Sequence, residues 1–183
     1  MMAALSGFAP GEGRSFGRQQ DEGTDLGQAK GQALYYLKFR SRSSAEIDGY
    51  LKRKGFQQHV RDEVLSWLQE LRYIDDLQFA RDWIQNRNRT KPVGQRRLIQ
   101  ELRQKGISKE TIEEAVEEFR ASVDERELAL KVAADRVRVY ARGDSQTAKR
   151  RLAAYLLRRG FSIDDVHYAV ENVVEQERQE LPD

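Results

Sequence analysis

Apolar residues recur along most of this chain at intervals of three and four positions, the spacing of helices that bury one face. The pattern is clearest in the middle of the chain, where two such stripes are separated by Pro92 and Gly94. Proline cannot continue a helix and glycine permits a turn, so we predict two helices joined at this point. Asp75 or Asp76 can cap the first helix by accepting backbone hydrogen bonds, and Gly106 can end the second in a left-handed conformation.

The same arrangement occurs three times. In each copy a lysine or arginine, a glycine and an apolar residue follow one another at the end of the middle helix. The glycines are Gly55, Gly106 and Gly160, separated by 106 − 55 = 51 and 160 − 106 = 54 residues. Such a period predicts three tandem three-helix repeats that cover each other's apolar faces, an all-α fold with no sheet.

Glycine content and apolar spacing set the expected boundaries. Seven of the thirteen glycines fall at or before Gly31, and apolar residues there are isolated, so we predict a disordered tail. The predicted segments are a tail at 1–27 and helical repeats at 28–74, 75–123 and 124–178.

Two further helix starts have candidate caps. Ser43 or Ser44, together with Glu46, resembles a capping box, in which a hydroxyl and a carboxylate satisfy free backbone N–H groups. In the third repeat, Ser145 can cap the middle helix. These residues predict where two of the middle helices begin.

Composition narrows the class of protein. Charged residues make up 34% of the chain, which suits thin helical layers better than a deep core. The absence of cysteine excludes disulfides and thiolate metal sites. No apolar run approaches the roughly 20 residues that span a bilayer, and the start lacks the apolar core of a secretory signal, so we expect a cytoplasmic protein with no membrane partner.

Charge is distributed unevenly along the chain. Between Arg87 and Lys105 there are seven basic residues and one acid, Glu101, whereas residues 110–118 contain five acids and no base. The helix macrodipole accounts for cations near a helix end, at roughly 0.3–1 kcal/mol each. It does not account for cations that the pattern places in first turns, which are Arg96, Arg97, Lys149, Arg150 and Arg151.

The basic residues of the middle helices therefore predict an anionic partner, with a merely solvated face as the alternative. Nucleic-acid phosphates and acidic protein surfaces both fit this charge, since arginine forms paired hydrogen bonds with either anion. The candidate binding residues are Arg53, Arg96, Arg97, Arg103, Lys105, Lys149, Arg150, Arg151 and Arg158.

Other polar and aromatic residues have structural explanations. Asp75 and Asp76 are adjacent and cannot share a helix face, so capping is favoured over catalysis. Trp67 and Trp83 occur at core spacing, which favours packing over a stacking platform for bases. We find no P-loop, metal-ligand cluster or nucleophile beside a base, so the sequence predicts neither an enzyme nor a cofactor.

Three linked motifs resemble the bacterial RecX family. They are Ser41-Arg42-Ser43 leading to Lys54-Gly55-Phe56, then Tyr73-Ile74-Asp75-Asp76-x-x-Phe79-Ala80-Arg81-x-Trp83, and Leu98-x-x-Glu101-Leu102-x-x-Lys105-Gly106-Ile107. The similarity covers about residues 31–175. It departs at Leu71-Arg72-Tyr73, where the family commonly has a glycine, and this puts the turn between the first two repeats in question.

The resemblance implies a non-enzymatic regulator, usually an inhibitor, of the RecA recombinase in DNA recombination, repair and the SOS response. Family members are elongated and curved, and they bind in the groove of the RecA–DNA filament, where they limit filament growth, ATP hydrolysis and strand exchange. We expect a monomer that contacts the RecA filament and DNA phosphates. A stand-alone nonspecific nucleic-acid-binding protein and a helical scaffold for another partner are the alternatives.

Overall fold

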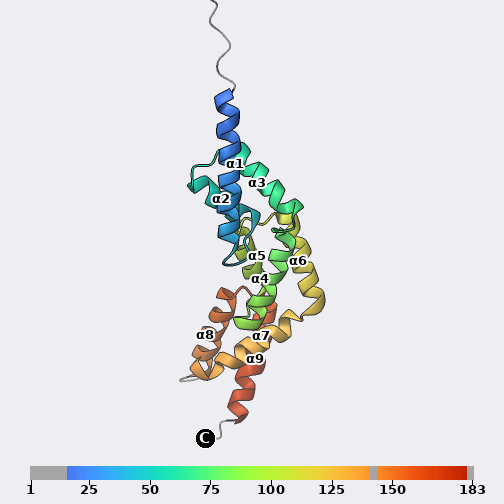
Figure 1. The fold of residues 1–183 in the computed structure, drawn as a ribbon. Coiled ribbons are helices and arrows are strands. Elements are labelled where there is room, and N and C mark those ends of the chain that lie inside the picture. The colour runs from blue at the N-terminus through green and yellow to red at the C-terminus, as the bar shows by residue number, and fades with distance from the viewer. Residues whose placement is uncertain (1–15, 141–143, 181–183) are drawn as a thin grey trace, which may run out of the picture. The chain divides into compact units, whose positions relative to one another are not determined.

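The protein is entirely helical over the residues that the computed structural model describes, which are 16–140 and 144–180 (Figure 1). Side chains are described for residues 25–140 and 144–177. The helices are α1 (Phe16–Leu37), α2 (Ser44–Arg53), α3 (Gln58–Glu70), α4 (Asp76–Thr90), α5 (Gln95–Gln104), α6 (Lys109–Ser122), α7 (Glu125–Tyr140), α8 (Ser145–Arg158) and α9 (Ile163–Glu180). They form three successive three-helix groups, which confirms the predicted fold class.

Helix α1 begins at Phe16, inside the segment 1–27 for which the sequence predicts a tail. The first fifteen residues of that segment lie outside the described part of the chain. In the second half of α1, Ala29 and Ala33 are fully buried against neighbouring helices. A helix anchored at one end can extend by one hydrogen bond per residue, because only its nucleation is costly.

The three helix-ending glycines all have the predicted left-handed conformation. Their φ angles are +93° at Gly55, +74° at Gly106 and +88° at Gly160. In each copy the apolar residue after the glycine donates its N–H to a carbonyl five residues earlier, as Ile107 does to Leu102 at 3.2 Å. These hydrogen bonds are the Schellman closure, which satisfies the last free carbonyls of a helix.

Two of the predicted caps are confirmed and one is wrong. The Ser43 hydroxyl accepts from the N–H of Glu46 at 3.1 Å, and Asp75 accepts from the N–H of Gln78 at 2.9 Å. In the third repeat the cap is Asp144, which accepts from the N–H of Thr147 at 2.9 Å, so Ser145 is the first helical residue. A carboxylate suits the positive end of the helix dipole better than a hydroxyl does.

The chain forms two compact units. The first contains the described residues up to Ser41 together with Ile47–Tyr73, and the second contains Arg42–Glu46 and the described residues from Ile74 onward. In the first unit, α1 packs on α3, and the rings of Tyr36 and Tyr50 stack with centroids 4.2 Å apart.

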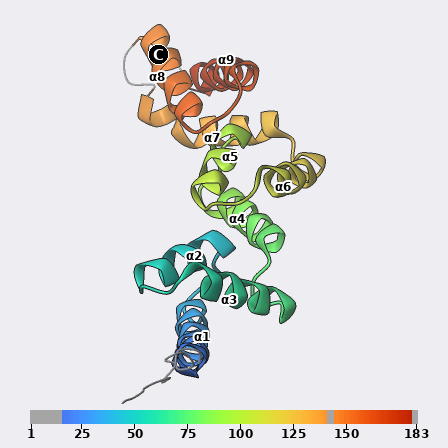
Figure 2. The same cartoon turned by 90° about the horizontal axis from the view of Figure 1, so that it is seen from above.

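The second unit has two apolar cores, one for each of its three-helix groups. The core of α4–α6 includes Phe79, Ile84, Leu98 and Ile112. The larger core of α7–α9 is centred on Phe161, which is fully buried. In both Figure 1 and Figure 2 these last three helices lie together as one group.

Within the second unit, the start of α5 meets the end of α8 at backbone contact. The N–H of Gly94 donates to the carbonyl of Arg159 at 3.0 Å. A Cβ atom at Gly94 would lie 2.4 Å from backbone atoms of Gly160 and Phe161. Gly94 has an ordinary φ of −73°, so glycine is required here for close approach and not for backbone conformation.

Arg72 lies in the turn where the family resemblance led us to expect glycine. Its φ of 56° makes it the one non-glycine residue in the left-handed region among those described. This conformation costs roughly 1–2 kcal/mol for a residue with a Cβ, while glycine adds unfolded-state entropy of roughly 0.5–1 kcal/mol. The strained residue thus lies within the three positions at which the chain departs from the family resemblance.

We therefore expect Arg72→Gly to raise the free energy of unfolding by about 0.5 kcal/mol, because glycine relieves the left-handed strain. Urea denaturation monitored by circular dichroism measures the change. Arg72→Ala is the matched control, since alanine removes the charge but keeps the Cβ, and it should give no gain. Equal stabilisation by both variants would assign the effect to charge instead of backbone strain.

Candidate functional site

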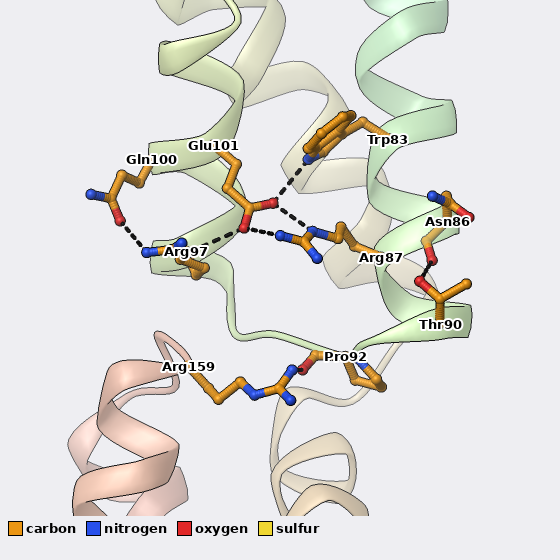
Figure 3. A network of polar contacts seen from close by, with 9 residues as sticks. All are labelled: Trp83, Asn86, Arg87, Thr90, Pro92, Arg97, Gln100, Glu101 and Arg159. Carbon is orange, nitrogen blue, oxygen red and sulfur yellow. Dashed lines mark hydrogen bonds and ion pairs between the residues drawn. The ribbon is translucent and has the colours of Figure 1, made fainter. Parts of the chain in front are cut away.

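A buried carboxylate, Glu101, organises the polar contacts of the middle repeat (Figure 3). Only 5% of Glu101 is exposed. It accepts hydrogen bonds from the Trp83 indole N–H at 3.0 Å, from Arg87 Nε at 2.7 Å and Arg87 Nη2, and from Arg97 Nε at 3.1 Å. Helices α4 and α5 are therefore joined by one carboxylate that accepts hydrogen bonds from three side chains.

Two opposing effects act on the pKa of Glu101. Burial disfavours the carboxylate and raises the pKa, whereas hydrogen bonds from Arg87, Trp83 and Arg97 favour the carboxylate. The hydrogen bonds together outweigh burial, and the pKa of Glu101 lies below its ordinary value. The group is therefore ionised at neutral pH and holds both arginines in place.

Lys105 is also engaged within the protein. Its ammonium group pairs with Glu46 at 2.9 Å and lies 4.9 Å from the centroid of the Trp83 ring. Its carbonyl accepts from the Ser43 hydroxyl at 2.6 Å. Close by, a Cβ at Gly106 would meet that of Ala45 at 2.3 Å, so this corner is tightly packed.

Three of the nine candidate cations are thus occupied by internal ion pairs. They are Arg97, with Glu101, Lys105, with Glu46, and Lys149, with Glu171 of α9. Contact of these three residues with a partner stays a prediction. Two of the three acids come from elements distant in sequence, and a count of local charge does not include them.

The other six candidates are exposed and form no ion pair with any described residue. They are Arg53 on α2, Arg96 and Arg103 on α5, and Arg150, Arg151 and Arg158 on α8. Arg53 lies in the first unit and the other five in the second. The second unit therefore carries most of the free positive charge in this set.

The helix dipole opposes a candidate cation at the start of α5 but none at the start of α8. Arg96 is the second residue of α5, where the dipole opposes a cation. Because α8 begins at Ser145, Lys149, Arg150 and Arg151 lie beyond its first turn, where the dipole effect has faded. Arg150 and Arg151 need a different explanation, since the dipole neither favours nor opposes a cation there.

Arg103 lines a groove of about 190 Å³ between α5 and α6. The apolar lining of the groove comes from Ile99, Ile112 and Val116. Acids of α6 line the same groove, with Glu113 paired to Lys109 at 3.5 Å and Glu117 paired to Arg120 at 3.3 Å. This surface has mixed charge over an apolar floor.

Tyr155 is the centre of a second polar cluster, between α7 and α8. Its hydroxyl accepts from Arg159 Nε at 3.1 Å and Nη2 at 2.8 Å. Arg159 also donates Nη1 to the Pro92 carbonyl at 2.8 Å (Figure 3). On the α7 side, Arg136 lies 5.7 Å from the Tyr155 ring centroid, and the ring of Tyr140 lies 6.1 Å away.

Sequence reasoning missed the role of Glu101 and its partners. One signal was present, because Arg97 and Glu101 are four residues apart on a helix and such pairs meet. The contribution of Arg87 carried no such signal, since it comes from another helix. Trp83 packs against the core as predicted, but its N–H also serves Glu101.

Both histidines of the chain lie at the surface. His59 is exposed in the first turn of α3, and His167 is exposed on α9. Over the described residues there is no cluster of His, Cys, Asp or Glu suited to a metal ion. The helices that the structure describes include none with the length and apolar character needed to cross a membrane.

Comparison with known proteins connects this architecture with a family. Sequence models of three RecX domains match the chain in order. The first three-helix domain matches residues 29–68, the second 75–116 and the third 124–170. The three matches follow the order of α1–α3, α4–α6 and α7–α9.

Individual proteins of this family are similar to the chain over most of its length. A protein of Prosthecochloris aestuarii named regulatory protein RecX is 34% identical over 151 residues, which cover 82% of this chain and 97% of that protein. The protein of the same name from Bacillus licheniformis is 34% identical over 149 residues, 81% of this chain, although this chain spans 56% of its length.

A solved structure shares the fold. The crystal structure of RecX from Lactobacillus salivarius superposes with a TM-score of 0.73 at 20% identity, over 82% of this chain and 97% of that one. With three domain matches in order and a relative at 34% identity along nearly its whole length, the chain belongs to the RecX family of regulatory proteins.

Proposed function

We propose that this protein regulates the RecA recombinase, as an inhibitor that binds within the groove of the RecA–DNA filament. Binding there limits filament growth, and with it ATP hydrolysis and strand exchange. Membership of the RecX family supports the regulatory role. The protein acts as a binding partner without chemistry of its own, in the cytoplasm and as a monomer.

The observation that carries the proposal is the set of exposed, unpaired arginines on α5 and α8. Arg96 stands where the helix dipole opposes it, and Arg150 gains nothing from the dipole. An exposed arginine that forms no ion pair within the chain can donate its planar N–H groups to an acidic protein surface or a phosphate, even where a nearby carboxylate attracts it, as Asp144 does Arg150. The internal network of Glu101 holds α5 firmly against α4 and so fixes where its outer face points.

The test is a RecA ATPase assay on single-stranded DNA with increasing amounts of the protein. We expect wild-type protein to reduce ATP hydrolysis. The variant Arg96→Gln, Arg103→Gln and Arg150→Gln should need at least about tenfold more protein for half-inhibition, because charge-assisted hydrogen bonds contribute roughly 1.5–3 kcal/mol each. Arg97 is left intact, since its pairing with Glu101 makes it structural.

A charge-matched control removes three exposed cations outside this set. Lys52→Gln, Arg72→Gln and Lys131→Gln change residues of α2, of the turn after α3 and of α7. This variant should inhibit as wild type does. Undiminished inhibition by the triple arginine variant would show that these arginines do not contact the filament, and no effect of wild-type protein on ATP hydrolysis would overturn the proposed function.

A further inference from the structure

The Tyr155 cluster continues into a row of arginines on the outer side of α8. Arg151, Tyr155 and Arg158 are four and three residues apart, so they share one face of the helix. Both arginines are exposed, and at 1.5 Å per residue they are about 10 Å apart along the axis. Arg136 adds a further exposed guanidinium from α7 at the Tyr155 ring.

Three acids of α9 pair with cations outside this group: Glu171 with Lys149, Glu177 with Arg138 and Asp165 with Arg126. Helix α8 itself contains no acidic residue, and its cap, Asp144, lies before its first residue. On α7 the adjacent exposed acid is Asp135. Positive charge therefore dominates this face.

Tyr155 fixes the geometry of the cluster. Its hydroxyl and the Pro92 carbonyl together hold three N–H groups of Arg159. Its ring is flanked by Arg136, Arg159 and Tyr140, so it is not free to stack on a base. The arrangement favours contact with phosphates and offers no means of reading sequence.

We infer that Arg136, Arg151 and Arg158 form a binding surface for the phosphodiester backbone of a nucleic acid, independent of base sequence. This inference deepens the proposed function, because it names nucleic acid as the partner of the α7–α8 face. Tyr155 acts as a positioning residue.

A nucleic-acid strand suits this surface better than an acidic protein does. A strand presents one negative charge every 3.4 Å or so, a regular row that matches arginines spread over about 10 Å of helix. The groove between α5 and α6 differs, because two basic residues and two acidic residues of α6 line it over apolar side chains. They are Lys109, Arg120, Glu113 and Glu117. Mixed charge over an apolar floor is typical of protein interfaces, whereas dense positive charge is typical of phosphate contact.

The experiment measures binding of the full chain to a fluorescent oligo-thymidine single strand, by anisotropy over a series of salt concentrations and without RecA. The variant Arg136→Gln, Arg151→Gln and Arg158→Gln should bind at least about tenfold more weakly. The slope of log K against log salt should flatten by about 2, since each lost phosphate contact removes about 0.7 for a single strand.

The charge-matched control is Lys52→Gln, Arg72→Gln and Lys131→Gln, which removes three exposed cations elsewhere and should leave the slope unchanged. The inference would be overturned if the triple variant of Arg136, Arg151 and Arg158 bound the strand with wild-type affinity. It would also be overturned if the wild-type protein did not bind the strand. A variant that binds the strand normally but no longer inhibits RecA would overturn it as well, because the face would then bind protein. Normal strand binding by wild-type protein with no effect on RecA would reject the proposed function and retain the inference.

Discussion

Replacing Gly94 by alanine is expected to lower the free energy of unfolding of the second unit by about 3 kcal/mol, at the upper end of the range for overpacking. The added methyl group would lie 2.4 Å from the Gly160 carbonyl carbon and oxygen and from the Phe161 nitrogen. All three are backbone atoms, so no flexible side chain can move aside. The start of α5 and the end of α8 would have to separate, with loss of the hydrogen bond from Gly94 to Arg159.

Urea denaturation followed by circular dichroism measures this loss. Gly31→Ala is the control, because a Cβ at Gly31 meets nothing within 4 Å and the residue lies inside α1. There alanine should stabilise the protein by up to about 1 kcal/mol through helix propensity. An unchanged unfolding midpoint for Gly94→Ala would contradict the end-to-end contact between the two middle helices.

Replacing Glu101 by alanine is expected to cost about 3 kcal/mol. Removal of one partner from a buried ion pair typically costs about 3–5 kcal/mol, because the remaining charge is left without compensation. The lower end of this range applies here, because the side chains of Arg87 and Arg97 are 28% and 43% exposed. Water can therefore partly hydrate them once Glu101 is gone. The Trp83 N–H loses its acceptor as well.

The contribution of Glu101 should depend on pH in a defined direction. Its pKa is lowered in the folded protein relative to the ordinary value of 4.5. The unfolded chain therefore binds a proton first as pH falls, and the stabilisation is complete above 4.5 and is lost as pH falls through the folded-state pKa. The difference in unfolding free energy between wild type and Glu101→Gln should be largest at neutral pH and shrink in acid.

Glu118→Gln provides the matched control. Arg81 forms a similar two-pronged pair with Glu118, with Nε and Nη2 at 2.7 and 2.6 Å, but that pair lies at the surface. Solvent screens exposed pairs, so its loss should have a much smaller effect than the loss of Glu101. If Glu101→Gln and Glu118→Gln lowered the free energy of unfolding equally, burial of Glu101 would add nothing to its stabilising effect.

Part of the candidate site was predictable and part was not. The sequence identified exposed cations such as Arg96, Arg103 and Arg151, because helical periodicity separates outer from inner faces. It could not separate them from Lys105 and Lys149, whose acids, Glu46 and Glu171, lie on other helices. Charge counted along the chain misses acids that only folding brings near.

The amino-acid sequence alone is enough to predict three helical repeats, the helix-ending glycines and two of the helix caps. Those features depend on interactions within a few residues, such as the hydrogen bond of Asp75 with Gln78 and the left-handed turn at Gly106. The packing of the helices places Glu101 among three donating side chains and brings Gly94 against Gly160. Both features depend on which helices meet and at what distance. Residues of other helices set that distance, and the local periodicity of the sequence does not encode it.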